Sequence, residues 1–210
     1  MTTGRIIHSE ACLREGADWL AAREPAFAMA FAQVGPLPLR RKAGGFGDLV
    51  SAIVSQQVSV ASAEAIWQRL LDAGMTSPLT IEAASDEELR GLGLSKPKVR
   101  YLRALAMAKI DFEALARMPD PQVLDSLVKI PGIGLWTAEI YATFSLGRAD
   151  VFAAGDLALQ EAAKILFKLE ARPSEKALRE RALAWSPWRA VAARTLWAYY
   201  RISKQRDGIR

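Results

Sequence analysis

Cysteine and histidine are almost absent from this chain of 210 residues. Each occurs once, as Cys12 and His8. A single cysteine excludes intrachain disulfides, cysteine-rich zinc sites and a four-cysteine iron–sulfur cluster. A single histidine near the N-terminus argues against a histidine-based triad or a histidine metal cluster. We therefore expect a solvated His8, an inert Cys12, and chemistry that depends on other side chains.

Long hydrophobic runs are also missing. No apolar run reaches the roughly 18 residues that a membrane span needs. The first residues, MTTGRIIHSEACLREGAD, carry charges where a signal peptide would have its apolar region. These features predict an intracellular protein with no membrane partner.

Alternating strand patterns joined by hairpin turns are not found, and nearly every long segment has helical periodicity. With 51% hydrophobic residues, the chain can bury a sizeable core. The predicted fold is all-α, with two helical lobes, a helix-hairpin-helix motif and a cleft between the lobes. The predicted helices cover residues 10–22, 25–33, 46–57, 59–73, 86–91, 97–109, 120–129, 134–146, 156–169, 174–184 and 187–204.

Capping and stop signals agree with these helices. Ser59 and Asp86 are expected N-caps, and Gly74 is an expected helix stop. Prolines stand at or before three further helix starts, at positions 119, 173 and 187. The Gly- and Pro-rich stretch 34–47 reads as a loop. We accordingly expect an N-terminal helical arm at 1–34, packing on the C-terminal lobe of a main domain at 35–210.

Positive charge is concentrated near the C-terminus. The net charge is +5, and residues 173–210 hold nine Lys/Arg against three Asp/Glu. Such a lobe could follow a phosphate backbone and gain affinity by releasing counterions. A solvated helix face with a basic tail would give the same charge count.

The most specific pattern is a glycine hairpin, Pro131-Gly132-Ile133-Gly134, followed 22 residues after Gly134 by Asp156. Two glycines after a proline allow a tight turn and leave N–H groups exposed at the start of the next helix, where an anion can bind. Thr137 adds a hydroxyl that could reach the same phosphate. A plain connection between two helices would also fit the turn, and Asp156 alone would fit a helix N-cap.

Four segments together decide between these interpretations: LVSAIVSQQVSVASAEAI, PGIGLWTAEI, DVFAAGDLALQ and WSPWRAVAARTLWAYY. In order and spacing they resemble the helix-hairpin-helix, Gly/Pro-rich loop, Asp (HhH-GPD) superfamily of DNA glycosylases, of the 3-methyladenine DNA glycosylase II type. The resemblance implies base excision repair: an enzyme that flips alkylated purines out of double-stranded DNA and hydrolyses the N-glycosidic bond, leaving an abasic site.

The resemblance gives Asp156 the role of the catalytic carboxylate, which stabilises a sugar cation and orients water. Lyase-competent relatives carry a lysine nucleophile five residues after the hairpin proline, where this chain has Trp136. A monofunctional glycosylase without lyase activity is therefore expected. Trp136, Trp197 and Tyr141 are the implied base-binding aromatics, with Trp188 a further candidate.

Gln56 and Gln57 match the family's turn that enters the minor groove, with Gln57 at the position of the residue that fills the gap left by the flipped nucleotide. Capping amides that face water are the alternative. A family tyrosine corresponds to Ile140, which leaves the choice of base open. Trp19, Trp67 and Trp185 are expected in the core.

No cofactor is expected, although the resemblance implies a structural Na⁺ or K⁺ on the carbonyls of Val128, Ile130 and Ile133. The expected partner is damaged double-stranded DNA, bound by a monomer that is cytoplasmic and associated with the nucleoid on DNA. A non-catalytic helix-hairpin-helix DNA-binding protein and a glycosylase for deaminated or ethenoadenine bases are the alternatives. Composition alone would also allow a helical scaffold.

Overall fold

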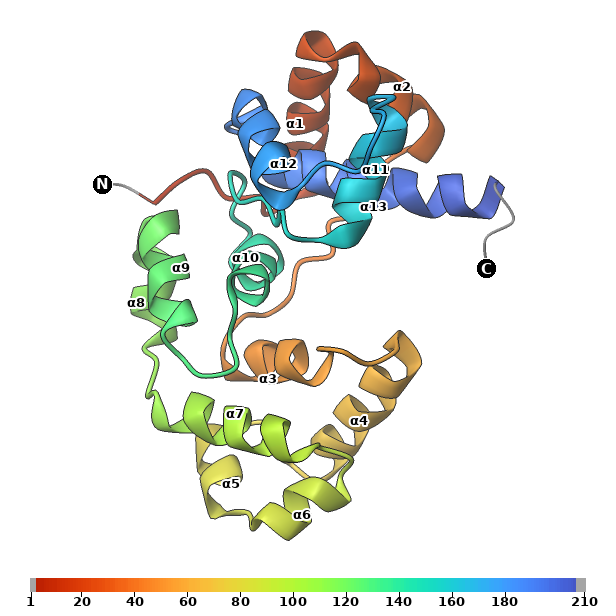
Figure 1. Cartoon of the computed structure of the whole chain (residues 1–210). Coiled ribbons are helices and arrows are strands. Elements are labelled where there is room, and N and C mark those ends of the chain that lie inside the picture. The colour runs from red at the N-terminus through yellow and green to blue at the C-terminus, as the bar shows by residue number, and fades with distance from the viewer. Residues whose placement is uncertain (1–2, 207–210) are drawn as a thin grey trace. The chain divides into compact units, whose positions relative to one another are not determined.

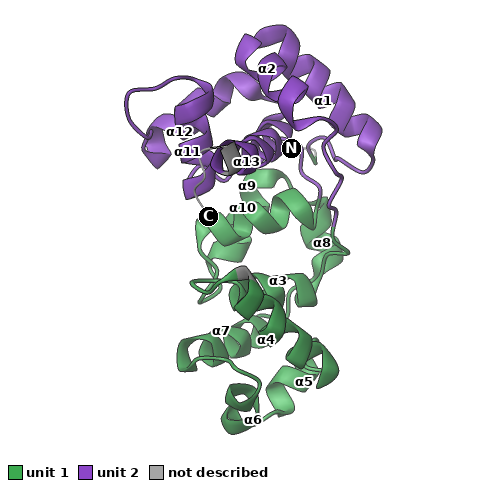
Figure 2. Ribbon diagram, turned by 90° about the vertical axis from the view of Figure 1, so that its right-hand side faces the viewer, with its two compact units in different colours: residues 1–3, 42–146 green, residues 4–41, 147–210 purple. Residues whose placement is uncertain are grey.

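This computed structural model describes residues 3–206, which form thirteen α-helices and one short 3-10 helix. Within that range there is no strand, only an isolated antiparallel bridge between Ile6 and Arg148. The predicted all-α class is confirmed. The chain divides into two compact units, shown in green and purple in Figure 2.

Unit 1 comprises Lys42–Leu146 together with Thr3. Its helices follow one another along the chain from orange-yellow to blue-green in Figure 1. They are α3 (Phe46–Val54), α4 (Val60–Asp72), α5 (Pro78–Ala83), α6 (Asp86–Gly91), α7 (Lys96–Met107), α8 (Phe112–Arg117), α9 (Asp120–Val128) and α10 (Leu135–Phe144).

Unit 2 joins two distant parts of the chain, residues 4–41 and 147–206. Its elements are α1 (Glu10–Arg23), α2 (Pro25–Val34), α11 (Leu157–Leu166), α12 (Glu175–Ala182), the 3-10 helix η1 (Leu183–Trp185) and α13 (Arg189–Arg206). Helix α13 packs against α11, α2 and α1. The predicted boundary at 34/35 does not coincide with a unit boundary, because α1 and α2 share a core with the C-terminal helices.

An aromatic cluster forms part of the core of unit 2. The Trp185 ring lies 5.2 Å from Phe27 and 5.7 Å from Phe167, measured between ring centroids. Trp185 is buried, as expected, whereas Trp19 and Trp67 are only half-buried. The Arg23 guanidinium lies over the Trp19 ring at 3.9 Å, so this tryptophan forms a cation–π contact with an arginine.

All eleven predicted helices are present, and two short ones, α5 and α8, were missed. Each has six residues, too few to show helical periodicity. Helix α6 is equally short, but the expected cap at Asp86 marked its start. The predicted N-cap Asp86 was wrong by one residue. Ser85 is the cap, and its hydroxyl accepts from the backbone N–H of Glu88 while the Glu88 carboxylate accepts from the N–H of Ser85.

Other local signals are confirmed. The Ser59 hydroxyl accepts from the N–H of Ser62 at 3.1 Å, and Gly74 has a φ of +68° just after α4. Helix α3 ends at Val54, three residues before the predicted end. The two glutamines that follow therefore lie in a turn and not on the helix.

Helix α1 approaches α13 closely at Gly16. A Cβ atom there would lie 2.7 Å from Cγ2 of Val191 and 2.8 Å from Cε3 of Trp188. Both neighbours are buried, so neither side chain can move freely.

We predict that Gly16→Ala destabilises the protein by about 1–3 kcal/mol, because the added methyl overpacks this contact. Urea denaturation measures the change. Gly91→Ala is the matched control, since nothing lies within 4 Å of its Cβ position. Equal stability of the two variants would contradict the close approach.

Candidate functional site

The glycine hairpin joins α9 to α10. Helix α9 ends at Val128 with Lys129 as its C-cap, and Gly134 is the N-cap of α10. The backbone N–H of Ile133 donates to the carbonyl of Ile130 at 3.0 Å, which closes the turn. No side chain caps α10, so its first N–H groups point out of the helix as an anion site requires.

The two glycines of the hairpin differ in backbone conformation and in the space around them. Gly132 has a φ of +93°, and a Cβ there would lie 2.3 Å from Cγ of Tyr101. Both the backbone conformation and the packing therefore demand glycine. Gly134 has an ordinary φ of −81°, and nothing lies within 4 Å of its Cβ position. Its missing side chain leaves open space at the N-terminus of α10.

A groove of about 640 Å³ runs along the hairpin within unit 1. Gln57, Trp136 and the glycines of the hairpin line it, so the structure brings together most of the predicted DNA-contacting residues. Trp136 is 38% exposed, so part of its indole is accessible at the groove.

Gln57 is an exposed residue of the turn after α3. Its φ is +56°, a left-handed conformation that residues other than glycine seldom adopt. Such strained positions cluster at functional sites. Arg40, Lys109 and Lys168 also have a positive φ, so the role of Gln57 at the groove stays a prediction.

Gln56 and Thr137 face inward instead. The side-chain amide of Gln56 donates to the carbonyl of Gly132 at 2.9 Å and to the Thr137 hydroxyl at 3.1 Å. Thr137 is only 3% exposed. Its expected contact with a phosphate is therefore replaced by a buried contact that stabilises the hairpin, and Gln56 connects the turn after α3 to that hairpin.

Tyr141 is placed differently from the prediction. It is 2% exposed, and its hydroxyl accepts from the backbone N–H of Gly45 at 3.0 Å. Burial raises the pKa of Tyr141 to about 12. This tyrosine belongs to the contact between α10 and the start of α3, so it does not form the wall of a base pocket.

Asp156 lies in unit 2 as the N-cap of α11. Its Oδ1 atom accepts from the N–H of Ala158 at 2.9 Å and from the N–H of Leu159 at 3.1 Å. The capping interpretation is thus confirmed, and it does not compete with a catalytic one. The cap fixes the carboxylate at the N-terminus of α11, the positive end of the helix dipole.

Trp197 lies on α13 and contacts the same carboxylate. Its indole N–H donates to Oδ1 of Asp156 at 3.2 Å, and its ring is half-buried. Two of the residues that the resemblance implies for the active site are therefore joined by a hydrogen bond across 41 positions of sequence. Stacking of Trp197 on a base stays a prediction.

The loop before Asp156 is held from several sides by residues that the sequence did not reveal. Arg189 forms an ion pair with Asp150, with Nε 2.7 Å from Oδ1, and Ser186 donates to the same carboxylate. The Gln160 amide donates to the carbonyl of Ala154 at 2.9 Å. Ser186 and Arg189 lie 36 and 39 positions from Asp150, so no local pattern could have identified these two partners.

Leu157 was also missed. It follows Asp156 directly and is 61% exposed. A single exposed leucine is ordinary on a protein surface. Its position beside the carboxylate is what makes it a candidate contact, and only the structure shows that exposure.

A model of the HhH-GPD superfamily of base excision DNA repair proteins matches residues 50–188. The chain belongs to the HhH-GPD superfamily. The match contains the hairpin, Gln57 and Asp156. It ends just before α13, the helix that carries Trp197.

Named relatives and solved structures agree with the superfamily. DNA-3-methyladenine glycosylase 1 of Schizosaccharomyces pombe is 30% identical over 161 residues, which cover 72% of this chain and 71% of the relative. The structure of the S. pombe 3-methyladenine DNA glycosylase with abasic DNA has a TM-score of 0.80 at 27% identity, covering 87% of this chain and 95% of that one. A DNA-3-methyladenine glycosidase of Bacillus halodurans has a TM-score of 0.80 at 34% identity, covering 90% and 91%.

Relatives differ in length. A Bacillus subtilis relative is 29% identical over 162 residues, and the chain spans 56% of its length.

The side chains of the described residues offer no obvious metal site. Among residues 3–206 no cluster of three or more His, Cys, Asp or Glu side chains could hold a metal ion. The predicted cation site uses only backbone carbonyls, those of Val128, Ile130 and Ile133. The Ile130 carbonyl already accepts the hydrogen bond of the turn, and a carbonyl oxygen has a second lone pair for a cation. Cation binding here stays a prediction.

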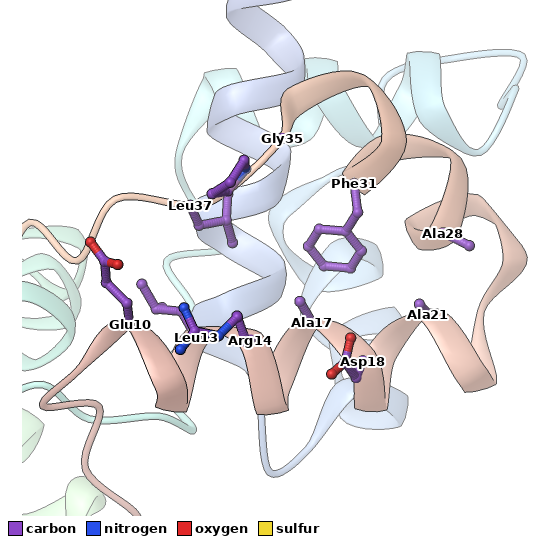
Figure 3. A pocket seen from close by; sticks show the side chains of 11 residues that line it. Glu10, Leu13, Arg14, Ala17, Asp18, Ala21, Ala28, Phe31, Gly35 and Leu37 are labelled. Atoms are coloured by element: carbon purple, nitrogen blue, oxygen red, sulfur yellow. The ribbon is translucent and has the colours of Figure 1, made fainter.

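A second cavity, of about 440 Å³, lies in unit 2 and contains none of the predicted site residues. Figure 3 shows Leu13, Ala17 and Ala21 of α1 on one side and Phe31 of α2 on the other.

Within the described part of the chain, no helix is long and apolar enough to span a membrane.

We predict that alanine at one hairpin glycine lowers stability, whereas alanine at the other weakens DNA binding. Gly132→Ala will lower the free energy of unfolding by about 2 kcal/mol or more, because it combines a left-handed conformation with a clash against Tyr101. Gly134→Ala will leave stability nearly unchanged but weaken DNA binding, because its methyl fills the space where a phosphate approaches.

Urea denaturation and fluorescence anisotropy on an abasic duplex measure the two effects. Loss of stability without loss of binding in Gly134→Ala would contradict the assignment of that space to a phosphate.

Proposed function

We propose that this chain is a monofunctional DNA N-glycosylase of base excision repair that removes alkylated purines of the 3-methyladenine class. The observation that carries the proposal is the anchored carboxylate of Asp156, held by the N-terminus of α11 and by the indole of Trp197. Membership of the HhH-GPD superfamily and the names of the relatives support the same reaction.

The reaction begins when the damaged nucleotide leaves the base stack, since its glycosidic bond cannot be reached inside a duplex. The C1′–N bond then breaks, the electron pair leaves with the base, and positive charge develops on the sugar. A fixed negative charge at Asp156 stabilises this oxocarbenium-like state. Water adds to C1′ and loses a proton, which leaves a free base and an abasic site.

Asp156 suits this role because its carboxylate is already oriented. Three N–H groups hold Oδ1 in place before any substrate arrives, so little reorganisation is needed when charge develops. The ion pair of Asp150 with Arg189 and the contact of Gln160 with Ala154 keep the preceding loop in position.

Aromatic side chains explain the choice of an alkylated purine. Such bases carry positive charge, and electron-rich indoles attract cations through their ring faces. Trp136 offers an exposed indole for this purpose, and Trp197 a half-buried one. The half-buried Ile140, where relatives carry a tyrosine, leaves the breadth of accepted bases to experiment.

Double-stranded DNA with damaged bases is the proposed partner, bound by a monomer in the cytoplasm at the nucleoid. The groove at the hairpin supplies the phosphate contact, through the open space at Gly134. A structural Na⁺ or K⁺ at the hairpin carbonyls is part of the proposal, and no catalytic cofactor is needed.

We predict that Asp156→Asn reduces release of 3-methyladenine from methylated duplex DNA by at least about 100-fold, because the charge opposite the sugar cation is lost. Asparagine caps helices as well as aspartate, so stability and DNA affinity should change little. Chromatography of released bases under single-turnover conditions measures the effect.

Asp111→Asn is the matched control, since Asp111 caps α8 through the N–H of Ala114. Equal release by Asp156→Asn and wild type would remove Asp156 from the mechanism. Intact DNA binding by the wild type without release of alkylated, deaminated or ethenoadenine bases would favour a non-catalytic binding protein.

We also predict that borohydride does not trap the protein on damaged DNA. A lyase forms a Schiff base through a lysine, and this chain has Trp136 at the corresponding position. Gel electrophoresis after reduction reveals a covalent complex if one forms. A trapped complex would disprove the monofunctional assignment.

A further inference from the structure

The turn that carries Gln57 follows the C-terminus of α3, where the backbone needs an external partner. The last carbonyls of a helix have no partner within the helix and lie at the negative end of its dipole. In α3 the final residue is Val54. How this end is held decides where Gln57 is presented.

Lys98 of α7 provides that partner. Its Nζ atom donates to the carbonyl of Val54 at 2.6 Å, and the residue is only 8% exposed. Desolvation lowers the pKa of the ammonium group, because burial disfavours its charge. A buried lysine is costly unless its charge is well placed, and the C-terminus of a helix is such a place.

The same helix also holds the hairpin. Tyr101 lies three residues after Lys98, on the same face of α7, and its ring packs against Gly132. Gln56 completes the connection by donating from the turn to the carbonyl of Gly132 and to Thr137. One face of α7 thus fixes both walls of the groove, the turn with Gln57 and the glycine hairpin.

We propose that Lys98 is a positioning residue for base extrusion, which holds the turn so that Gln57 enters the space left by the flipped nucleotide. The inference rests on the proposed function and extends it from the carboxylate to the side of the groove that opens the duplex. Lys98 is too buried to bind a phosphate itself, so it acts through the backbone of Val54.

The test compares two DNA substrates that carry the same damaged base. In one the base is paired, and its removal leaves a gap that Gln57 must fill. In the other the base lies in a one-nucleotide bulge, where no gap forms. Single-turnover excision is measured on both for Lys98→Met, Gln57→Ala and the double variant.

We expect Lys98→Met to lower excision of the paired base by about tenfold, since small displacements of positioning groups have effects of this order. Excision of the bulged base should stay within about twofold of wild type. Gln57→Ala should give the same pattern, and the double variant should be no worse than either single one, because both changes remove the same contribution.

Lys96→Met is the matched control, since it removes an exposed lysine two positions away on the same helix. Equal losses on both substrates, additive losses in the double variant, or no loss in Lys98→Met would each overturn the proposal. If Lys98→Met does not fold by circular dichroism, Gln56→Ala removes the other attachment of the turn, and the same outcomes apply to it.

Fluorescence of 2-aminopurine beside the damaged base reports extrusion independently of excision. Extrusion by the wild type that falls in Lys98→Met, without any base release, would support the positioning role and contradict the glycosylase reaction. Base release that is unchanged by substitution of Lys98 or Gln57 would support the glycosylase reaction and contradict the positioning role.

Discussion

The hydrogen bonds to one carboxylate oxygen set the geometry on which the proposed chemistry depends. Oδ1 of Asp156 receives two backbone N–H groups of α11 and the indole N–H of Trp197. The start of α11 and a side chain of α13 are therefore joined through this one oxygen atom. Because a charge held by fixed dipoles needs little rearrangement when a cation forms beside it, the cap of a helix can also serve as an electrostatic catalyst.

Unit 1 contains the turn to which we assign contact with the duplex, and its neighbours hold that turn from two sides. Helix α3 is held at its start, where the Asp48 carboxylate accepts from Gly44 and Ser145, and at its end by Lys98. The turn beyond it bears Gln57 in a strained conformation. Strain of this kind persists only where the surroundings over-determine the backbone, as they do here.

Helical periodicity and turn chemistry predicted most of the fold, because both act between residues close in sequence. The six-residue helices α5 and α8 gave too few periods to be detected, and the shift from Asp86 to Ser85 reflects two adjacent capping residues. The Val54 carbonyl at the end of α3 is bonded by Lys98, which lies 44 positions away, so no local pattern could have shown this contact.

The sequence by itself determined the helical class, the hairpin, the acid at position 156 and the tryptophan in place of a lysine, since each is a matter of local pattern or residue identity. Only the tertiary structure decided which side chains face outward. Thr137 and Tyr141 lie on the same helix as the exposed Trp136, yet packing against α3 and the turn that follows it buries them. The partners of Asp156, Gln56 and Lys98 likewise come from segments that only folding brings together.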